Sequence, residues 1–204
     1  MAIQIQETFQ VAAPIQQVWD FMLTPENIVT CMPGASLEEI IDDTTFVGAV
    51  KLKVGAITAK YRGTIAYTEP DSANYTVVLV AEAKEKGGGT VTGTITCKLK
   101  SLENGITEAS CESNIDLTGK IIQVGRGMID GVSAQIIAKF VANVKRNLEP
   151  SEEQLAAAAE GAEVAPKGPV SRADEDDSIN VLAVVFNVVW GAIVKFFKRL
   201  FGRK

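Results

Sequence analysis

Residues 3–22 read IQIQETFQVAAPIQQVWDFM and place a strand directly before a short helix. Apolar and polar residues alternate over residues 3–11, which is typical of a strand with one buried face. Pro14 suits a first helical turn, and the apolar residues within 18–23 give the next segment a broad apolar face. The chain is therefore expected to open with a strand and a helix that share one core.

A second short helix and a long run of strands are expected to follow. Residues 26–31 continue the helical pattern until Pro33 and Gly34 end it. The sequence beyond is rich in Val, Ile and Thr, and residues with turn chemistry, such as those at 87–89, interrupt it. Because the links are short, neighbouring strands should be antiparallel. The pattern predicts six strands near residues 36–42, 45–54, 57–68, 74–84, 90–101 and 105–118.

Residues 120–148 predict one long amphipathic helix. Apolar residues recur there at helical spacing from Ile121 to Val144, while charged residues such as Arg126 and Lys139 lie elsewhere. The order of elements predicts an α+β fold in which a curved, seven-stranded antiparallel sheet wraps around the last helix. A strongly bent sheet and a single helix do not fill the space between them, so this layout can leave a hollow. We expect residues 1–149 to form this one domain.

The remainder of the chain is expected to be a linker followed by a basic apolar helix. Residues 150–177 combine small residues and prolines with an acidic run, a composition too polar to fold, and their flexible reach is roughly 30 Å. Residues 178–204 hold five basic and no acidic residues. Their apolar stretch, 179–194, is about 24 Å long as a helix, which is short of the roughly 30 Å hydrocarbon core.

These features predict a helix that lies in the membrane interface, although a dip into the bilayer stays open. Basic residues prefer the cytoplasmic side of a membrane, so we expect this helix to lie at the cytoplasmic face of the cell membrane. The alternative is that this helix docks on the body or mediates oligomerisation. The residues expected to contact lipid are Phe186, Trp190, Lys195, Phe196, Phe197, Lys198, Arg199, Arg203 and Lys204.

Composition excludes several function classes. Residues 1–150 carry 13 basic and 17 acidic groups, and such an acidic body argues against nucleic acid as a partner. The chain has no histidine, which excludes Ser-His-Asp and Cys-His catalysis and zinc sites that need histidine. The N-terminus lacks the basic flank and apolar stretch of a secretory signal, so the body is expected in the cytoplasm.

The three cysteines are Cys31, Cys97 and Cys111, an odd number without close spacing. This spacing predicts neither a disulfide framework nor a CxxC metal or redox motif, and a reducing compartment fits it best. Cys31 lies near a helix end, but without a histidine partner we expect it to be packed rather than nucleophilic. No catalytic residue and no metal ligand is predicted.

Five short stretches resemble a known superfamily and one family within it. Residues 11–21, with their Val-Trp pair, resemble the opening of the START-like or SRPBCC superfamily. Residues 25–28 (PENI), 31–35 (CMPGA), 60–63 (KYRG) and 125–129 (GRGMI) are similar to the CoxG family of carbon monoxide dehydrogenase subunits within it. The resemblance covers residues 1 to about 149. It implies a helix-grip fold with an apolar cavity, and association with a molybdenum-containing carbon monoxide dehydrogenase, with the membrane and with quinone.

We therefore expect a membrane-tethered, non-catalytic carrier that recruits or supplies a respiratory quinone, menaquinone or another isoprenoid quinone, to that dehydrogenase. One alternative is a recruitment or assembly factor without ligand transport, and another is an enzyme of the polyketide cyclase type. The cavity wall is expected to include apolar, Met and aromatic side chains that suit a flat ring, although any one of them could be ordinary core. The candidates are Phe21, Cys31, Met32, Tyr61, Met128, Ile129, Val132 and Ile136.

Overall fold

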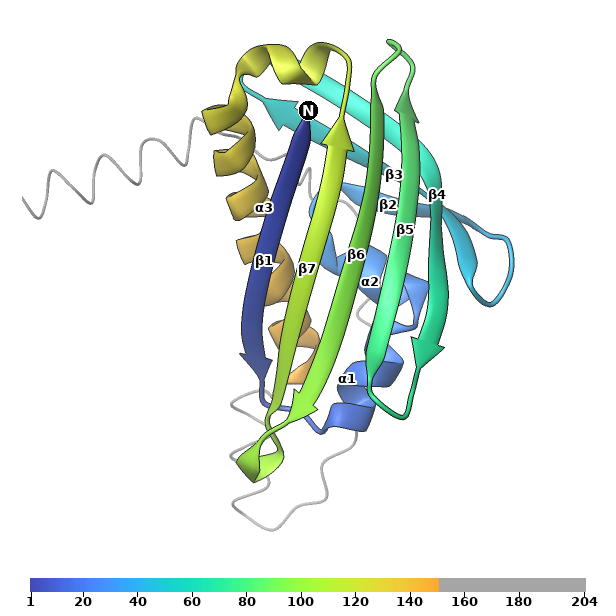
Figure 1. The fold of residues 1–204 in the computed structure, drawn as a ribbon, viewed down its shortest axis with the longest axis vertical. Coiled ribbons are helices and arrows are strands. Elements are labelled where there is room, and N and C mark those ends of the chain that lie inside the picture. The colour runs from blue at the N-terminus through green and yellow to red at the C-terminus, as the bar shows by residue number, and fades with distance from the viewer. Residues whose placement is uncertain (151–204) are drawn as a thin grey trace, which may run out of the picture.

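The computed structural model describes residues 1–150, and the predicted linker and C-terminal helix lie outside this part of the chain. One seven-stranded antiparallel sheet forms its frame, with the strand order β1-β7-β6-β5-β4-β3-β2 (Figure 1). This confirms the predicted α+β fold and the predicted number of strands. The strands are β1 (Ala2–Val11), β2 (Ala35–Ile40), β3 (Thr45–Val54), β4 (Ile57–Asp71), β5 (Thr76–Glu85), β6 (Thr90–Ser101) and β7 (Thr107–Leu117).

Three α-helices accompany the sheet. The short helices α1 (Ile15–Met22) and α2 (Pro25–Cys31) connect β1 at one edge of the sheet to β2 at the other. The long helix α3 (Arg126–Leu148) contacts α2 and β1 and runs along the sheet (Figure 1). Within residues 1–150, no helix is both long and apolar enough to cross a membrane.

The region between β7 and α3 is not part of the long helix. Residues Lys120–Val124 form a separate 3-10 helix, η2, and a second one, η1, spans Glu103–Gly105. Gly125 follows η2 with φ 86° and ψ 154°, a conformation that glycine adopts without the steric cost of a side chain. The prediction of one uninterrupted helix over residues 120–148 is therefore wrong at Gly125, where the chain turns before α3 begins.

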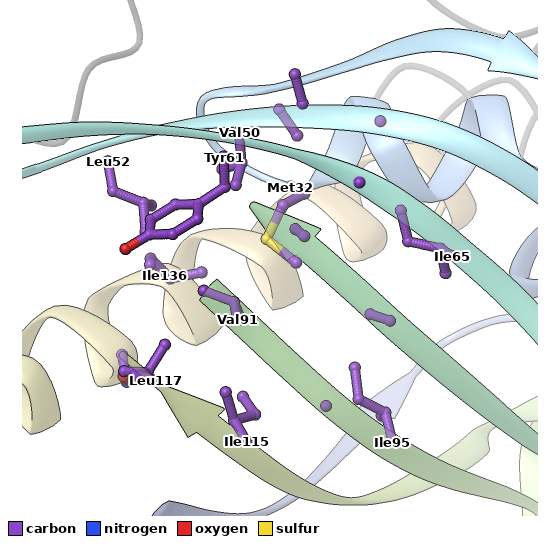
Figure 2. A pocket seen from close by; sticks show the side chains of 18 of the residues that line it. Met32, Val50, Leu52, Tyr61, Ile65, Val91, Ile95, Ile115, Leu117 and Ile136 are labelled. Carbon is purple, nitrogen blue, oxygen red and sulfur yellow. The ribbon is translucent and has the colours of Figure 1, made fainter. Parts of the chain in front are cut away.

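Buried apolar side chains gather in two clusters. One cluster packs Trp19 of α1 and Leu148 of α3 against Val77, Leu99 and their neighbours on the sheet. The other surrounds Tyr61, whose ring lies between Leu52 of β3 and Ile136 of α3 (Figure 2). The space between sheet and α3 is thus packed at two places instead of by one continuous core.

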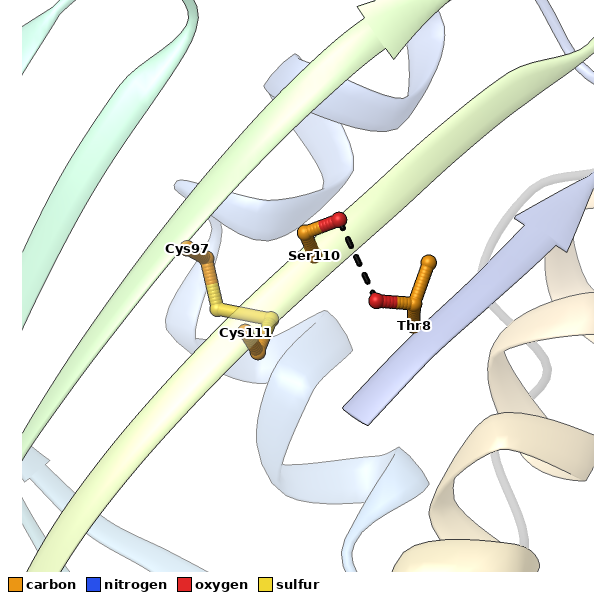
Figure 3. The surroundings of a disulfide bond; sticks show 4 residues. All are labelled: Thr8, Cys97, Ser110 and Cys111. Carbon is orange, nitrogen blue, oxygen red and sulfur yellow. Dashed lines mark hydrogen bonds between the residues drawn. A yellow bond between two sulfur atoms is a disulfide. The ribbon is translucent and has the colours of Figure 1, made fainter. Parts of the chain in front are cut away.

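A disulfide joins Cys97 of β6 to Cys111 of β7 (Figure 3). These two residues are direct partners in the strand register, and their Cα atoms are 4.2 Å apart. The prediction that the cysteines offer no disulfide is wrong for this pair. Spacing along the chain carried no sign of it, because the hairpin register, and not proximity in sequence, brings the two side chains to one face.

Candidate functional site

An apolar cavity of about 370 Å³ lies between the sheet and the helices. Its wall draws on all seven strands, with Ala35 and Ser36 from β2, and on α2, η2 and α3. Apart from Tyr61, the polar side chains of the wall are Ser36, Thr64 and Ser133. A cavity of this volume and lining suits a small, mostly apolar molecule. Figure 2 shows Met32, Val50, Leu52, Tyr61, Ile65, Val91, Ile95, Ile115, Leu117 and Ile136 around it.

Small residues on the inner face of the sheet create much of this volume. Gly48, Gly63 and Ala83 are successive register partners across β3, β4 and β5, and Ala81 pairs with Gly93 of β6. All five line the cavity. At Gly63 a Cβ atom would collide with the main-chain oxygen of Glu82, so no larger residue fits there without a shift. Gly63 thus allows the close approach of β5, and the other four small residues leave space that larger apolar side chains would fill.

The structure places five of the eight candidate residues on the cavity wall. Met32 comes from the end of α2, Tyr61 from β4, and Ile129, Val132 and Ile136 from α3. The α3 residues are spaced at three and four positions, so they share one helix face that points to the sheet. Their contact with a ligand stays a prediction.

The other three candidates lie away from the cavity wall. Phe21 and Cys31 do not line the cavity and instead pack in the first apolar cluster, Cys31 as a buried member and Phe21 as a partly buried one. Burial raises the pKa of the Cys31 thiol from 9.0 to about 11, which leaves it protonated and unreactive at neutral pH. Met128 is 42% exposed in the first turn of α3, near Gly55 of the β3–β4 turn.

One end of the cavity carries polar groups that the sequence-based prediction missed. Tyr61 and Glu85 are register partners on β4 and β5, so both side chains face inward. The Lys120 ammonium of η2 donates to Glu85 Oε1 over 2.7 Å, and the Glu85 side chain is only 7% exposed. Burial, and then the negative charge of Glu85, raise the pKa of the Tyr61 phenol, which therefore stays protonated. An available signal was the alternation of Val77, Leu79, Ala81, Ala83 and Glu85, which places Glu85 on the inner face.

The family model for the carbon monoxide dehydrogenase subunit CoxG matches residues 8–149. The chain belongs to this family. The match covers the three α-helices, strands β2 to β7 and the end of β1, and it confirms the resemblance seen in the sequence. No curated protein matches the sequence.

Solved structures share the fold of this CoxG family member at low sequence identity. A conserved protein from Geobacillus kaustophilus is 18% identical with a TM-score of 0.64, over 76% of this chain and 97% of that one. The ZhuI aromatase/cyclase from Streptomyces sp. R1128 is 14% identical with a TM-score of 0.56, over 80% and 100%. A START superfamily protein from Mycobacterium smegmatis is 10% identical with a TM-score of 0.51, over 72% and 97%. These likenesses establish the START-like helix-grip fold alone.

The sequence-based predictions also concerned metal ligands and lipid contacts, and the structure describes only the first of these regions. Within residues 1–150 of this CoxG family member, no three Cys, Asp or Glu side chains gather in a way that would hold a metal ion. The nine residues expected to contact lipid, from Phe186 to Lys204, lie outside the described residues, and their role stays a prediction.

Proposed function

We propose that this protein is a non-catalytic carrier of a hydrophobic ligand, a respiratory quinone such as menaquinone, for a molybdenum-containing carbon monoxide dehydrogenase. The observation that carries the proposal is the apolar cavity of about 370 Å³, which small inner-face residues keep open. Apolar burial favours a ligand of this kind by roughly 25 cal/mol per Å² of surface removed from water. The family name supports the dehydrogenase as the partner.

The second part of the proposal is membrane attachment through residues 178–204, the C-terminal tail. Its five cations and apolar residues suit the cytoplasmic face of an anionic membrane, where a quinone is dissolved. A body tethered to this surface through residues 150–177 would take quinone from the bilayer and present it to a soluble enzyme. In this scheme the protein changes no bond of its ligand; the dehydrogenase oxidises its own substrate and passes the electrons to the quinone, which is reduced.

A transfer assay with the full chain tests the carrier role. Donor vesicles of phosphatidylcholine and phosphatidylglycerol hold menaquinone, and acceptor vesicles hold a pyrene-labelled lipid whose fluorescence the arriving quinone quenches. We expect the protein to accelerate quenching in proportion to its concentration. The Ala81→Phe variant, which fills the cavity, should bind vesicles as well as wild type but should not accelerate quinone transfer. If the wild-type chain binds vesicles without accelerating transfer, the carrier role is refuted and recruitment of the dehydrogenase alone remains.

A further inference from the structure

Two buried polar atoms at and beside the cavity wall, one on Tyr61 and one on Glu85, have no protein partner in the described part of the chain. Within residues 1–150, Tyr61 Oη and Glu85 Oε2 are the buried side-chain polar atoms that make no hydrogen bond. Tyr61 is 1% exposed, and the Glu85 side chain is 7% exposed. Leaving a buried polar group without a partner costs about as much as a lost hydrogen bond, so such pairs call for an explanation.

The two atoms border the same small space. A Cβ atom on Gly89 would lie 3.0 Å from the Thr118 main-chain oxygen, 3.4 Å from Glu85 Oε2 and 3.5 Å from Tyr61 Oη. Gly89 is also held in place, because its carbonyl accepts a 2.8 Å hydrogen bond from the Glu85 amide. The absence of a side chain at position 89 therefore keeps this tight space free beside both polar atoms, and Tyr61 also lines the cavity.

Their hydrogen-bonding capacities are complementary. The Tyr61 phenol is protonated and donates, whereas Glu85 Oε2 only accepts while Lys120 neutralises the other carboxylate oxygen. A carbonyl group can satisfy Tyr61 but leaves Glu85 unpaired. A hydroxyl group satisfies both, since its oxygen accepts from Tyr61 and its proton is donated to Glu85.

We propose that Tyr61 and Glu85 bind a hydroxyl group on an otherwise apolar ligand, such as a phenol or hydroquinone. This inference rests on the proposed function, because it assigns a headgroup to the ligand of the same cavity. The reduced quinol carries hydroxyl groups where the oxidised quinone carries carbonyls. The cavity would therefore bind the reduced quinol more tightly than the oxidised quinone, so the redox state of the ligand would affect its release.

Two probes that differ in one methyl group test the hydroxyl site. The full chain is titrated with 2-naphthol and with 2-methoxynaphthalene by calorimetry; the ether oxygen accepts from Tyr61 but has no proton to donate to Glu85. We expect wild type to bind 2-naphthol about tenfold or more tightly than the ether. The Glu85→Gln and Tyr61→Phe variants should reduce that ratio of affinities several-fold, chiefly by weakening the binding of 2-naphthol.

Matched controls lie on the same strands. Glu82→Gln changes an exposed carboxylate on the outer face of β5, and Tyr67→Phe changes a tyrosine of β4 whose hydroxyl donates to the Met22 carbonyl. Both controls should keep the wild-type ratio. Equal binding of the two probes by wild type would overturn the hydroxyl site, with water filling the gap, while the apolar-ligand function would stand. Binding of neither probe would overturn both.

Discussion

The Asn143 side chain of α3 donates a 2.9 Å hydrogen bond to the main-chain carbonyl of Cys31, the last residue of α2. Carbonyls at the end of a helix lack a partner within that helix, so this bond satisfies a group that α2 cannot satisfy itself. It also ties α2 to α3 beside Met32, which lines the cavity. The bond thus links two of the elements that enclose the candidate site.

Replacing Asn143 by alanine should lower the free energy of unfolding by about 1–2 kcal/mol, because the carbonyl of the buried Cys31 loses its donor. Chemical denaturation monitored by circular dichroism measures the change. Arg146→Ala, at an exposed position on the same helix, serves as the control and should change stability by less than about 0.5 kcal/mol. Equal effects of both substitutions would show that the bond contributes nothing.

The Cys97–Cys111 disulfide predicts a thiol count. The full chain, denatured without reductant, should titrate one thiol, that of Cys31, and three after reduction. Replacing both Cys97 and Cys111 by alanine should lower the free energy of unfolding by about 2–4 kcal/mol. Reduced wild type should match that variant in denaturant titrations. A count of three thiols in protein purified without reductant would contradict the disulfide.

Strand alternation and turn chemistry predicted the fold well, because both are local properties of the sequence. The break at Gly125 was missed, since a glycine within an amphipathic pattern does not reveal its sign of φ. The disulfide and the Tyr61–Glu85 pair depend on which residues of two strands face each other, and register is a long-range property. The cavity depends on small residues meeting across four strands, which no single stretch displays.

Filling the cavity should separate binding from stability. Ala81→Phe places a large apolar side chain in the cavity, and we expect ligand affinity to fall at least tenfold while the chain stays folded. The control is Val80→Phe, one residue earlier on β5, where the side chain is 43% exposed on the outer face. Calorimetric titration with 2-naphthol and thermal unfolding measure the two properties. Unchanged affinity in Ala81→Phe would place the ligand elsewhere.

The buried Cys31 thiol predicts a specific pH dependence. Its pKa in the folded chain is about 11, against 9.0 for an exposed thiol, so the folded state holds the proton more tightly. The stability from this group is complete below pH 9 and is lost as the pH rises from about 9 toward 11. Alkylation of folded protein by iodoacetamide should therefore stay slow at about pH 9 and become fast in denaturant. Rapid labelling of the folded chain at about pH 8 would contradict this burial.

The C-terminal segment predicts salt-dependent binding to anionic membranes. Replacing Lys195, Lys198, Arg199, Arg203 and Lys204 by glutamine removes cations that contribute about 1 kcal/mol each near an anionic surface. Affinity of the full chain for phosphatidylglycerol vesicles, measured by cosedimentation, should fall at least about a hundredfold at low salt.

A matched double variant separates the tail from the body. Lys98→Gln with Lys100→Gln removes two exposed lysines from β6 and should leave vesicle binding within about twofold of wild type. Each tail cation should also steepen the loss of binding as salt is added, because ions screen exposed charges. Unchanged affinity of the five-fold variant would instead favour docking of this segment on the body or on a second copy. Analytical ultracentrifugation would then tell a compact monomer from an oligomer.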